Sequence, residues 1–192
     1  CYRFGLLRMT LTWNFRNELG WPNIIRIKGD EAYFEPDTEH GLTETGIEFV
    51  REMERLGMIM DVSHLSDAGI MDVFRYTKKP FVASHSNART VASNPRNLTD
   101  EMLKTLSERG GVAGINYCAD FLHDWQRGEQ AVSRVDDMIL HMKHMKKIGG
   151  IQCIGLGSDF DGIGGELEIK SPEDLPVLEQ AMRRAGFTEE EI

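Results

Sequence analysis

Met58-Ile-Met-Asp-Val-Ser-His64 and Pro80-Phe-Val-Ala-Ser-His85 are short apolar runs that each end in a histidine. Cys153-Ile-Gly-Leu-Gly-Ser-Asp159 repeats the pattern with a carboxylate at its end. Helix-like sequence flanks each run, which is typical of βα units and a parallel sheet. In an α/β barrel the carboxyl ends of the strands share one mouth. We therefore expect His64 and His85 to meet there as metal ligands, with Asp159 as an acid/base.

The same alternation of strand-like and helix-like sequence continues along the chain, roughly every 30 residues. Residues 14–41, rich in Gly, Pro, Asn and Asp, are predicted to form one long functional loop or lid. Strands are predicted at residues 6–12, 58–64, 80–85, 112–117 and 153–159, and helices begin at or after Thr43, Ser66, Thr99, Ser133 and Ser171.

These elements predict an α/β fold with about five βα units of a TIM-type (β/α)8 barrel. A complete barrel needs eight such units in about 250 residues. We therefore expect residues 1–192 to form a single domain that is the later portion of a barrel. Its first strands and its C-terminal end are then missing, in keeping with a chain that opens on Cys1 without Met.

Composition excludes several classes of partner. The 192-residue chain has a net charge of −9 and no block of basic residues, which disfavours nucleic acid and anionic membranes. No apolar stretch approaches the roughly 20 residues that a membrane span needs. The three cysteines are scattered, which argues against a disulfide framework and a cysteine zinc site. The same cysteine pattern makes a reducing compartment, the cytoplasm, the default localisation. The localisation itself is left open, because any targeting segment would lie upstream.

Each candidate residue also has a structural interpretation. One histidine at a strand end is often a hydrogen-bonded residue at the edge of a core, but two with Asp159 at matching ends favour a site. Arg96 follows the His85 strand, where it could clamp a substrate carboxylate. From the residues alone, a solvated surface arginine is the favoured interpretation. His141 and His144, three residues apart, are expected on a solvated helix face.

Four motifs resemble the membrane (renal) dipeptidase family of binuclear zinc enzymes, whose fold is a barrel. They are Met60-Asp-Val-Ser-His64, Phe81-Val-Ala-Ser-His85-Ser, Asn94-Pro-Arg96-Asn97 and Gly155-Leu-Gly-Ser-Asp159-Phe-Asp-Gly162. Their order and spacing agree across the whole chain. The resemblance implies zinc-dependent hydrolysis of dipeptides, with two zinc ions in the complete enzyme and little activity in this portion alone.

Site residues follow from the resemblance by position. His64 and His85 correspond to the two histidines that hold one zinc. Arg96 corresponds to the arginine that receives the terminal carboxylate of the dipeptide, and Asp159 to the acidic residue that handles protons. The family's Leu-Thr-His segment reads Leu11-Thr12-Trp13 here, which places Trp13 in the substrate site. An indole N–H can only donate a hydrogen bond, so carbonyl polarisation differs at this position.

The family's early His-x-Asp pair and its bridging glutamate have no counterpart in this sequence. Family members commonly dimerise, so the resemblance also implies a homodimer. Two other functions stay open at this point. One is a different metal-dependent amidohydrolase, against which Arg96 argues because it favours a free carboxylate. The other is a non-catalytic barrel remnant, which zinc content would distinguish from an enzyme.

Overall fold

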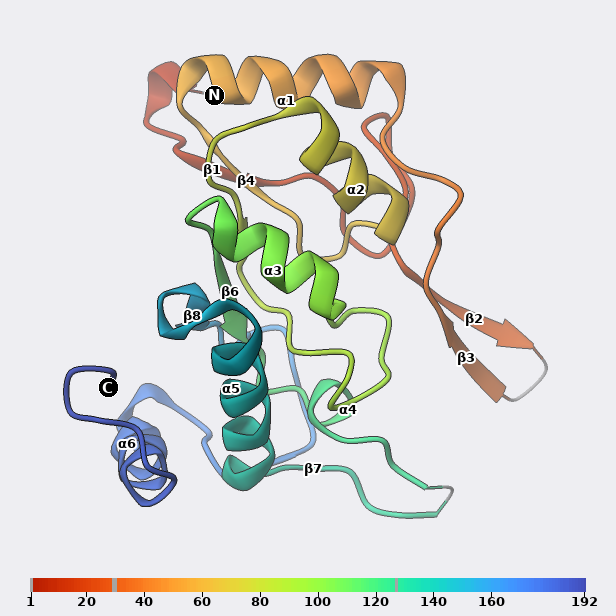
Figure 1. The fold of residues 1–192 in the computed structure, drawn as a ribbon. Helices are drawn as coiled ribbons and strands as arrows, with labels where there is room; N and C mark the ends of the chain where they lie inside the picture. The colour runs from red at the N-terminus through yellow and green to blue at the C-terminus, as the bar shows by residue number, and fades with distance from the viewer. Residues whose placement is uncertain (1, 29–30, 127) are drawn as a thin grey trace.

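A computed structural model describes residues 2–28, 31–126 and 128–192 of the chain. Five short strands form a parallel sheet in which each strand lies beside the next one along the chain, in the order β1-β4-β5-β6-β8 (Figure 1). This order confirms the predicted α/β barrel winding. The strands are β1 (Arg8–Thr10), β4 (Ile59–Asp61), β5 (Val82–Ala83), β6 (Val112–Ile115) and β8 (Ile154–Leu156).

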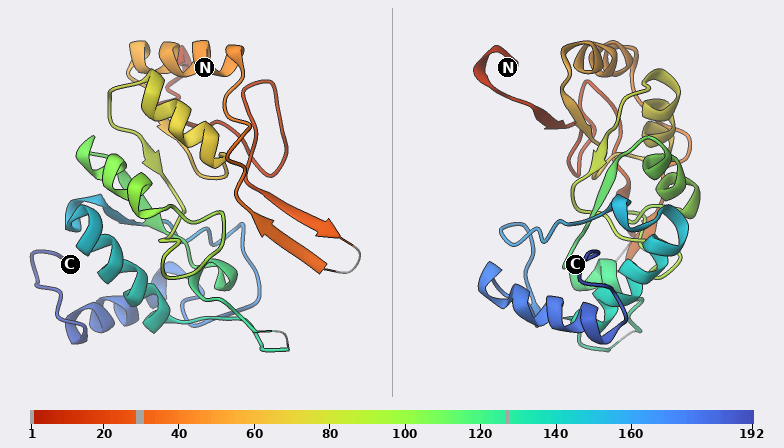
Figure 2. Two further views of the ribbon diagram at one scale, coloured as in Figure 1. Left: turned by 45° about the vertical axis from the view of Figure 1, so that its right-hand side comes forward. Right: turned by 60° about the vertical axis from the view of Figure 1, so that its left-hand side comes forward.

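Four long helices connect these strands and lie along one face of the sheet (Figure 2). Three of them begin where the sequence predicts, because Thr43, Ser66 and Thr99 each accept a hydrogen bond from a backbone N–H of the first turn. The helices are α1 (Glu44–Leu56), α2 (Asp67–Tyr76), α3 (Asp100–Glu108) and α5 (Val135–Gly149). A further helix, α6 (Leu175–Arg184), packs against α5.

The apolar stripes of these helices form one core against the sheet. Met138, Met142 and Met145 of α5 are buried, which confirms their prediction as packing residues. Each fully buried Leu, Val or Met side chain contributes about 1.5–3 kcal/mol of transfer free energy. Other core residues include Val50, Met53, Met60, Val73, Ala83, Leu103, Leu106, Ala113 and Ile115.

The expectation of one long loop over residues 14–41 is wrong. This segment contains an antiparallel hairpin, β2 (Ile24–Lys28) and β3 (Glu31–Glu35), which extends away from the sheet and its helices (Figures 1 and 2). Two runs of β-favouring residues separated by two residues were the signal for it. Short elements at β7 (Val132–Ser133), β9 (Glu166–Leu167) and α4 (Ala119–Leu122) also lie outside the predicted set, and α5 begins after Arg134 rather than at Ser133.

The observed strands end earlier than the apolar runs from which they were predicted. β4 ends at Asp61, β5 at Ala83 and β8 at Leu156, so His64, His85 and Asp159 lie two or three residues further, in the turns that leave the sheet. Part of the reason is the backbone conformation, since His64 (φ 72°) and Asp159 (φ 62°) are left-handed, which a strand does not accommodate. The three side chains therefore belong to the loops at the carboxyl ends of the strands, where barrel sites are built.

Candidate metal centre and substrate pocket

His64 and His85 meet although 21 residues separate them. Their Nε2 atoms are 2.9 Å apart and their ring centroids 4.9 Å apart, at an interplanar angle of 62°. Two ring nitrogens from separate turns thus point at one place. This is the convergence predicted from the matching ends of the two apolar runs.

A buried carboxylate aligns the two turns. Asp61, at the end of β4, accepts hydrogen bonds through Oδ1 from the backbone N–H groups of Ser63 (3.1 Å) and Ser84 (3.0 Å). Its Oδ2 accepts a third from the hydroxyl of Thr10 on β1 (3.1 Å). The Ser63 hydroxyl in turn accepts from the backbone N–H of His85 (3.1 Å). Asp61 thereby fixes three adjacent strand ends relative to one another.

The outer nitrogens of both rings have oxygen partners. His64 Nδ1 lies 2.9 Å from Asn14 Oδ1, and His85 Nδ1 lies 2.7 Å from Ser84 Oγ. Asn14 Oδ1 can only accept, so this contact favours a proton on His64 Nδ1. Arg96 Nε, which can only donate, donates to the same nitrogen, His64 Nδ1 (3.2 Å). The two partners favour opposite tautomers, so together they orient the His64 ring without assigning its proton. Metal-binding histidines are oriented by such contacts to the second nitrogen.

Burial keeps both imidazoles neutral. Desolvation, followed by the positive charge of Arg96, lowers the pKa of His64 to about 3. The same two causes lower the pKa of His85. A neutral imidazole is the form that binds zinc. The donor set therefore fits half of a zinc site. Within the described ranges, no group of three or more His, Cys, Asp or Glu side chains completes it.

Backbone strain marks the same place. Among the described residues that are not glycine, only His64 (φ 72°) and Asp159 (φ 62°) have a left-handed backbone. This conformation is uncommon for residues with a Cβ, and it concentrates at functional sites where the surroundings enforce it. Both predicted site residues on these turns are thus held in conformations that a free chain would avoid.

Asp159 faces the cavity from the turn after β8. Asn116, which follows β6, donates a hydrogen bond from Nδ2 to Asp159 Oδ2 (3.2 Å). Gly162 closes the turn by donating its N–H to the Asp159 carbonyl (2.8 Å), and a Cβ at Gly162 would lie 2.3 Å from Asp159 Oδ1. A side chain at position 162 would therefore displace the Asp159 carboxylate. Asp161 is exposed in the same turn, in keeping with a turn-forming role.

Arg96 is buried, with 7% of its surface exposed. The interpretation that the residues alone favoured, a solvated surface arginine, is therefore wrong. Its guanidinium carbon lies 5.2 Å from the centre of the Phe121 ring. Burial lowers its pKa to about 10, which leaves it charged at neutral pH. Nη1 and Nη2 are buried and have no hydrogen-bond partner among the residues that the structure describes. A buried guanidinium whose Nη atoms lack an anionic partner lowers the stability of the fold, so this arrangement favours the binding of a carboxylate ligand.

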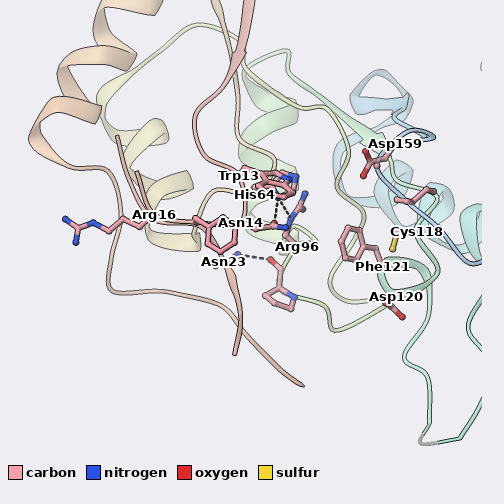
Figure 3. Close-up of a pocket in the computed structure, with 15 residues that line it drawn as sticks. Trp13, Asn14, Arg16, Asn23, His64, Arg96, Cys118, Asp120, Phe121 and Asp159 are labelled. Carbon is pink, nitrogen blue, oxygen red and sulfur yellow. Dashed lines mark hydrogen bonds between the residues drawn. The ribbon is translucent and has the colours of Figure 1, made fainter. Parts of the chain in front are cut away.

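The candidate site opens into a cavity of about 660 Å³ (Figure 3). Trp13, His64 and Arg96 lie close together on one side, and Asp159 lies across the cavity from them. Trp13 is 62% exposed, and its ring centroid lies 6.5 Å from that of His64 and 5.8 Å from that of Phe15. His85 does not line the cavity. It contacts the site through its Nε2 atom, which lies beside His64 Nε2.

Sequence reasoning missed the residues that support this site. The signal for Asp61 was a carboxylate inside an apolar run, because a carboxylate buried in a strand normally accepts hydrogen bonds from its surroundings. His141, expected on a solvated face, is fully buried, whereas its neighbour His144 is partly buried and bonded to Asp100. Asn14 and Asn116 carried no local signal, because their partners are distant in sequence.

Comparisons with known proteins identify the family of the chain. Residues 1–192 match the membrane dipeptidase family, peptidase family M19. An uncharacterised dipeptidase of Schizosaccharomyces pombe is 41% identical over 100% of this chain and 44% of its own length. An uncharacterised protein in the pqqA 5′ region of Klebsiella pneumoniae is 33% identical over 97% of this chain and 66% of its own length.

A solved structure is similar throughout. It is a metallopeptidase from Rhodobacter sphaeroides, liganded with a phosphinate mimic of the dipeptide L-Ala-D-Ala, with 35% sequence identity and a TM-score of 0.88. The match covers 99% of this chain and 52% of that chain. The chain thus spans about half of that structure's length and 44% and 66% of the two curated relatives. No helix in the described part of the chain is long and apolar enough to cross a bilayer.

Proposed function

The chain belongs to the membrane dipeptidase family, and we propose that it carries half of a zinc-dependent dipeptidase site. The observation that carries the proposal is Arg96, a buried guanidinium whose Nη atoms lack partners among the described residues, beside two paired histidines. An ammonium or neutral ligand would leave this charge uncompensated, whereas the terminal carboxylate of a dipeptide matches the fork.

His64 and His85 would hold one zinc ion through Nε2. Zinc bound there would lower the pKa of a water to about 7 and polarise the scissile carbonyl. In this proposal residues 1–192 form part of a larger barrel, and the remaining ligands, including those of a second zinc, come from other strands. This chain then contributes the contacts of Asn14, Arg96 and Ser84 with the two Nδ1 atoms, which orient both rings with Nε2 toward the proposed zinc position.

Asp159 would be the acid/base of the reaction. Its Oδ2 accepts from Asn116, so Oδ1 is the oxygen available to take a proton from the attacking water. The same carboxyl group would return the proton to the nitrogen of the leaving amine. The left-handed backbone at Asp159 and the close approach of Gly162 hold the carboxylate in one position for both transfers.

Arg96 and Trp13 would bind the substrate. Arg96 would receive the terminal carboxylate through Nη1 and Nη2 and thereby measure the length of the peptide. Trp13 and Phe121 line the same cavity with aromatic rings, which would pack against the substrate's side chains. Since the indole of Trp13 cannot accept a hydrogen bond, it would contribute contact area and one donor only.

The test uses the full-length protein and two matched substrates, a dipeptide and its C-terminal amide. Arg96→Ala removes a bidentate charged contact, so KM for the dipeptide should rise on the order of a hundredfold. Hydrolysis of the amide, which lacks the carboxylate, should change little. Arg55→Ala, on the exposed face of α1, is the control. Unchanged KM in Arg96→Ala, or a purified protein without bound zinc, would contradict the proposal.

A further inference from the structure

The turn that carries Arg96 is held through the carbonyl groups on either side of it. The Pro95 carbonyl accepts hydrogen bonds from Asn23 Nδ2 (2.7 Å) and Arg89 Nη2 (2.9 Å). The Asn97 carbonyl accepts a third from Arg89 Nε (2.9 Å). One guanidinium thus bonds to the residue before Arg96 and to the residue after it.

Arg89 is itself fixed by a carboxylate from a different element. Its Nη1 donates to Asp67 Oδ2 (2.6 Å) and its Nη2 to Asp67 Oδ1 (2.8 Å). The two side chains are 15% and 10% exposed, so solvent screens this bidentate pair poorly. Asp67 is the first residue of α2, the helix that follows the His64 turn. The pair therefore ties the Arg96 turn to the element beside His64.

Asn23 closes the network from the segment before the hairpin. Its Nδ2 donates to Asp67 Oδ1 (2.8 Å) as well as to Pro95, and its Oδ1 accepts from the backbone N–H groups of Asp67 (3.2 Å) and Asp37 (2.9 Å). Its contact with the Pro95 carbonyl is visible at the edge of the cavity in Figure 3. Asn23, Asp67 and Arg89 lie far apart in sequence, so this clamp exists only in the folded chain.

We propose that Asp67, Arg89 and Asn23 are positioning residues that set the direction of the Arg96 guanidinium for a substrate carboxylate. The inference rests on the proposed function, in which Arg96 receives that carboxylate. Nη1 and Nη2 of Arg96 have no partner in the described part of the chain that could orient them from the cavity side. Their direction is therefore set by the backbone of the turn, by the Phe121 ring beneath the guanidinium and by the hydrogen bond from Arg96 Nε to His64 Nδ1 (3.2 Å).

The arrangement accounts for the use of arginine at position 89. Two carboxylate oxygens and two carbonyl oxygens are bonded by one planar fork, a geometry that a lysine ammonium cannot reproduce. A shift of the turn by about 1 Å would separate the Arg96 fork from a carboxylate and would cost tenfold or more in binding. Loss of the clamp should therefore weaken carboxylate recognition specifically.

The experiment compares Arg89→Lys with Arg55→Lys in the full-length protein. Arg89→Lys keeps the charge opposite Asp67 but loses the contacts to the two carbonyls. We expect KM for a dipeptide to rise about tenfold with kcat nearly unchanged, and kcat/KM for the dipeptide amide to stay within about twofold. Arg55→Lys, in the exposed pair with Glu52, should leave both substrates unaffected. Asp67→Asn is the milder second variant if Arg89→Lys does not fold.

Several results would overturn the inference. Equal losses on the dipeptide and the amide would make the network merely structural, and failure of both variants to fold would lead to the same conclusion. Unchanged KM in Arg89→Lys, with a large rise in Arg96→Ala, would reject the positioning role and leave the proposed function intact. Unchanged KM in Arg96→Ala would reject both, so the two failures are distinguishable.

Discussion

His141, on the inner face of α5, provides the sharpest stability prediction. The ring is fully buried, its Nδ1 accepts a hydrogen bond from the backbone N–H of Ala88 (3.1 Å), and its Nε2 donates to the carbonyl of Leu122 (3.1 Å). These contacts require a neutral ring with its proton on Nε2. They join α5 to the loop that leads to Arg96 and to helix α4.

His141→Phe nearly preserves the volume but leaves one buried N–H and one buried C=O without partners. Each such group costs about 1–3 kcal/mol, so the variant should lose roughly 2–6 kcal/mol of unfolding free energy at neutral pH. Because the variant retains an aromatic ring, little of this loss should come from a cavity.

The loss should depend on pH in a defined direction. Burial lowers the pKa of His141 from 6.5 to about 4. Between pH 6.5 and pH 4 the unfolded chain binds a proton at His141 and the folded chain does not. The stability that His141 contributes is therefore fully present above pH 6.5 and decreases as the pH falls toward 4. At about pH 4.5 the difference in unfolding free energy between wild type and His141→Phe should have narrowed by about 2 kcal/mol relative to pH 7.

Urea denaturation followed by circular dichroism at several pH values measures both effects. His144→Phe, three residues further along α5, is the control. His144 Nε2 lies 2.7 Å from Asp100 Oδ1 in a pair that is partly exposed, so its loss should cost about 1 kcal/mol or less. The reasoning is refuted if His141→Phe costs no more than His144→Phe at neutral pH, or if its cost does not change between pH 7 and about pH 4.5.

Two further predictions concern the reacting groups. Asp159→Asn should lower kcat by at least about a thousandfold while zinc content, measured by atomic absorption, stays at the wild-type value; substantial turnover in that variant would remove Asp159 from proton transfer. His85→Ala should lower the zinc content of the full-length protein by about one ion per chain, because one of the two imidazoles of this site is lost. Retention of all zinc after that substitution would show that His85 is not a ligand.

Local sequence patterns predicted the parallel strands and the helices between them. Apolar periodicity and the capping residues Thr43, Ser66 and Thr99 predict helices that the structure contains, because these signals act within one turn. The hairpin within residues 14–41 escaped prediction although two β-favouring runs marked it, because the Gly, Pro, Asn and Asp content of the segment favoured a loop.

The candidate site divides in the same way. The positions of His64, His85 and Asp159 after apolar runs are local facts, and parallel strands bring their ends to one mouth. By contrast, the burial of Arg96, the contact of Asn14 with His64 and the clamp on Pro95 each join residues far apart in the chain.

Sequence by itself therefore determined the order of the five parallel strands and of the four helices between them, and it placed His64, His85 and Asp159 just after three of those strands. Tertiary structure alone decided that the Nε2 atoms of His64 and His85 approach to 2.9 Å and that His141 is a core residue. It also decided that Nη1 and Nη2 of Arg96 are buried without a hydrogen-bond partner among the residues that the structure describes. The physical reason is the distance along the chain over which each kind of interaction acts. Backbone conformation responds to neighbours a few residues away, whereas burial, tautomer and pKa depend on groups that only packing brings together.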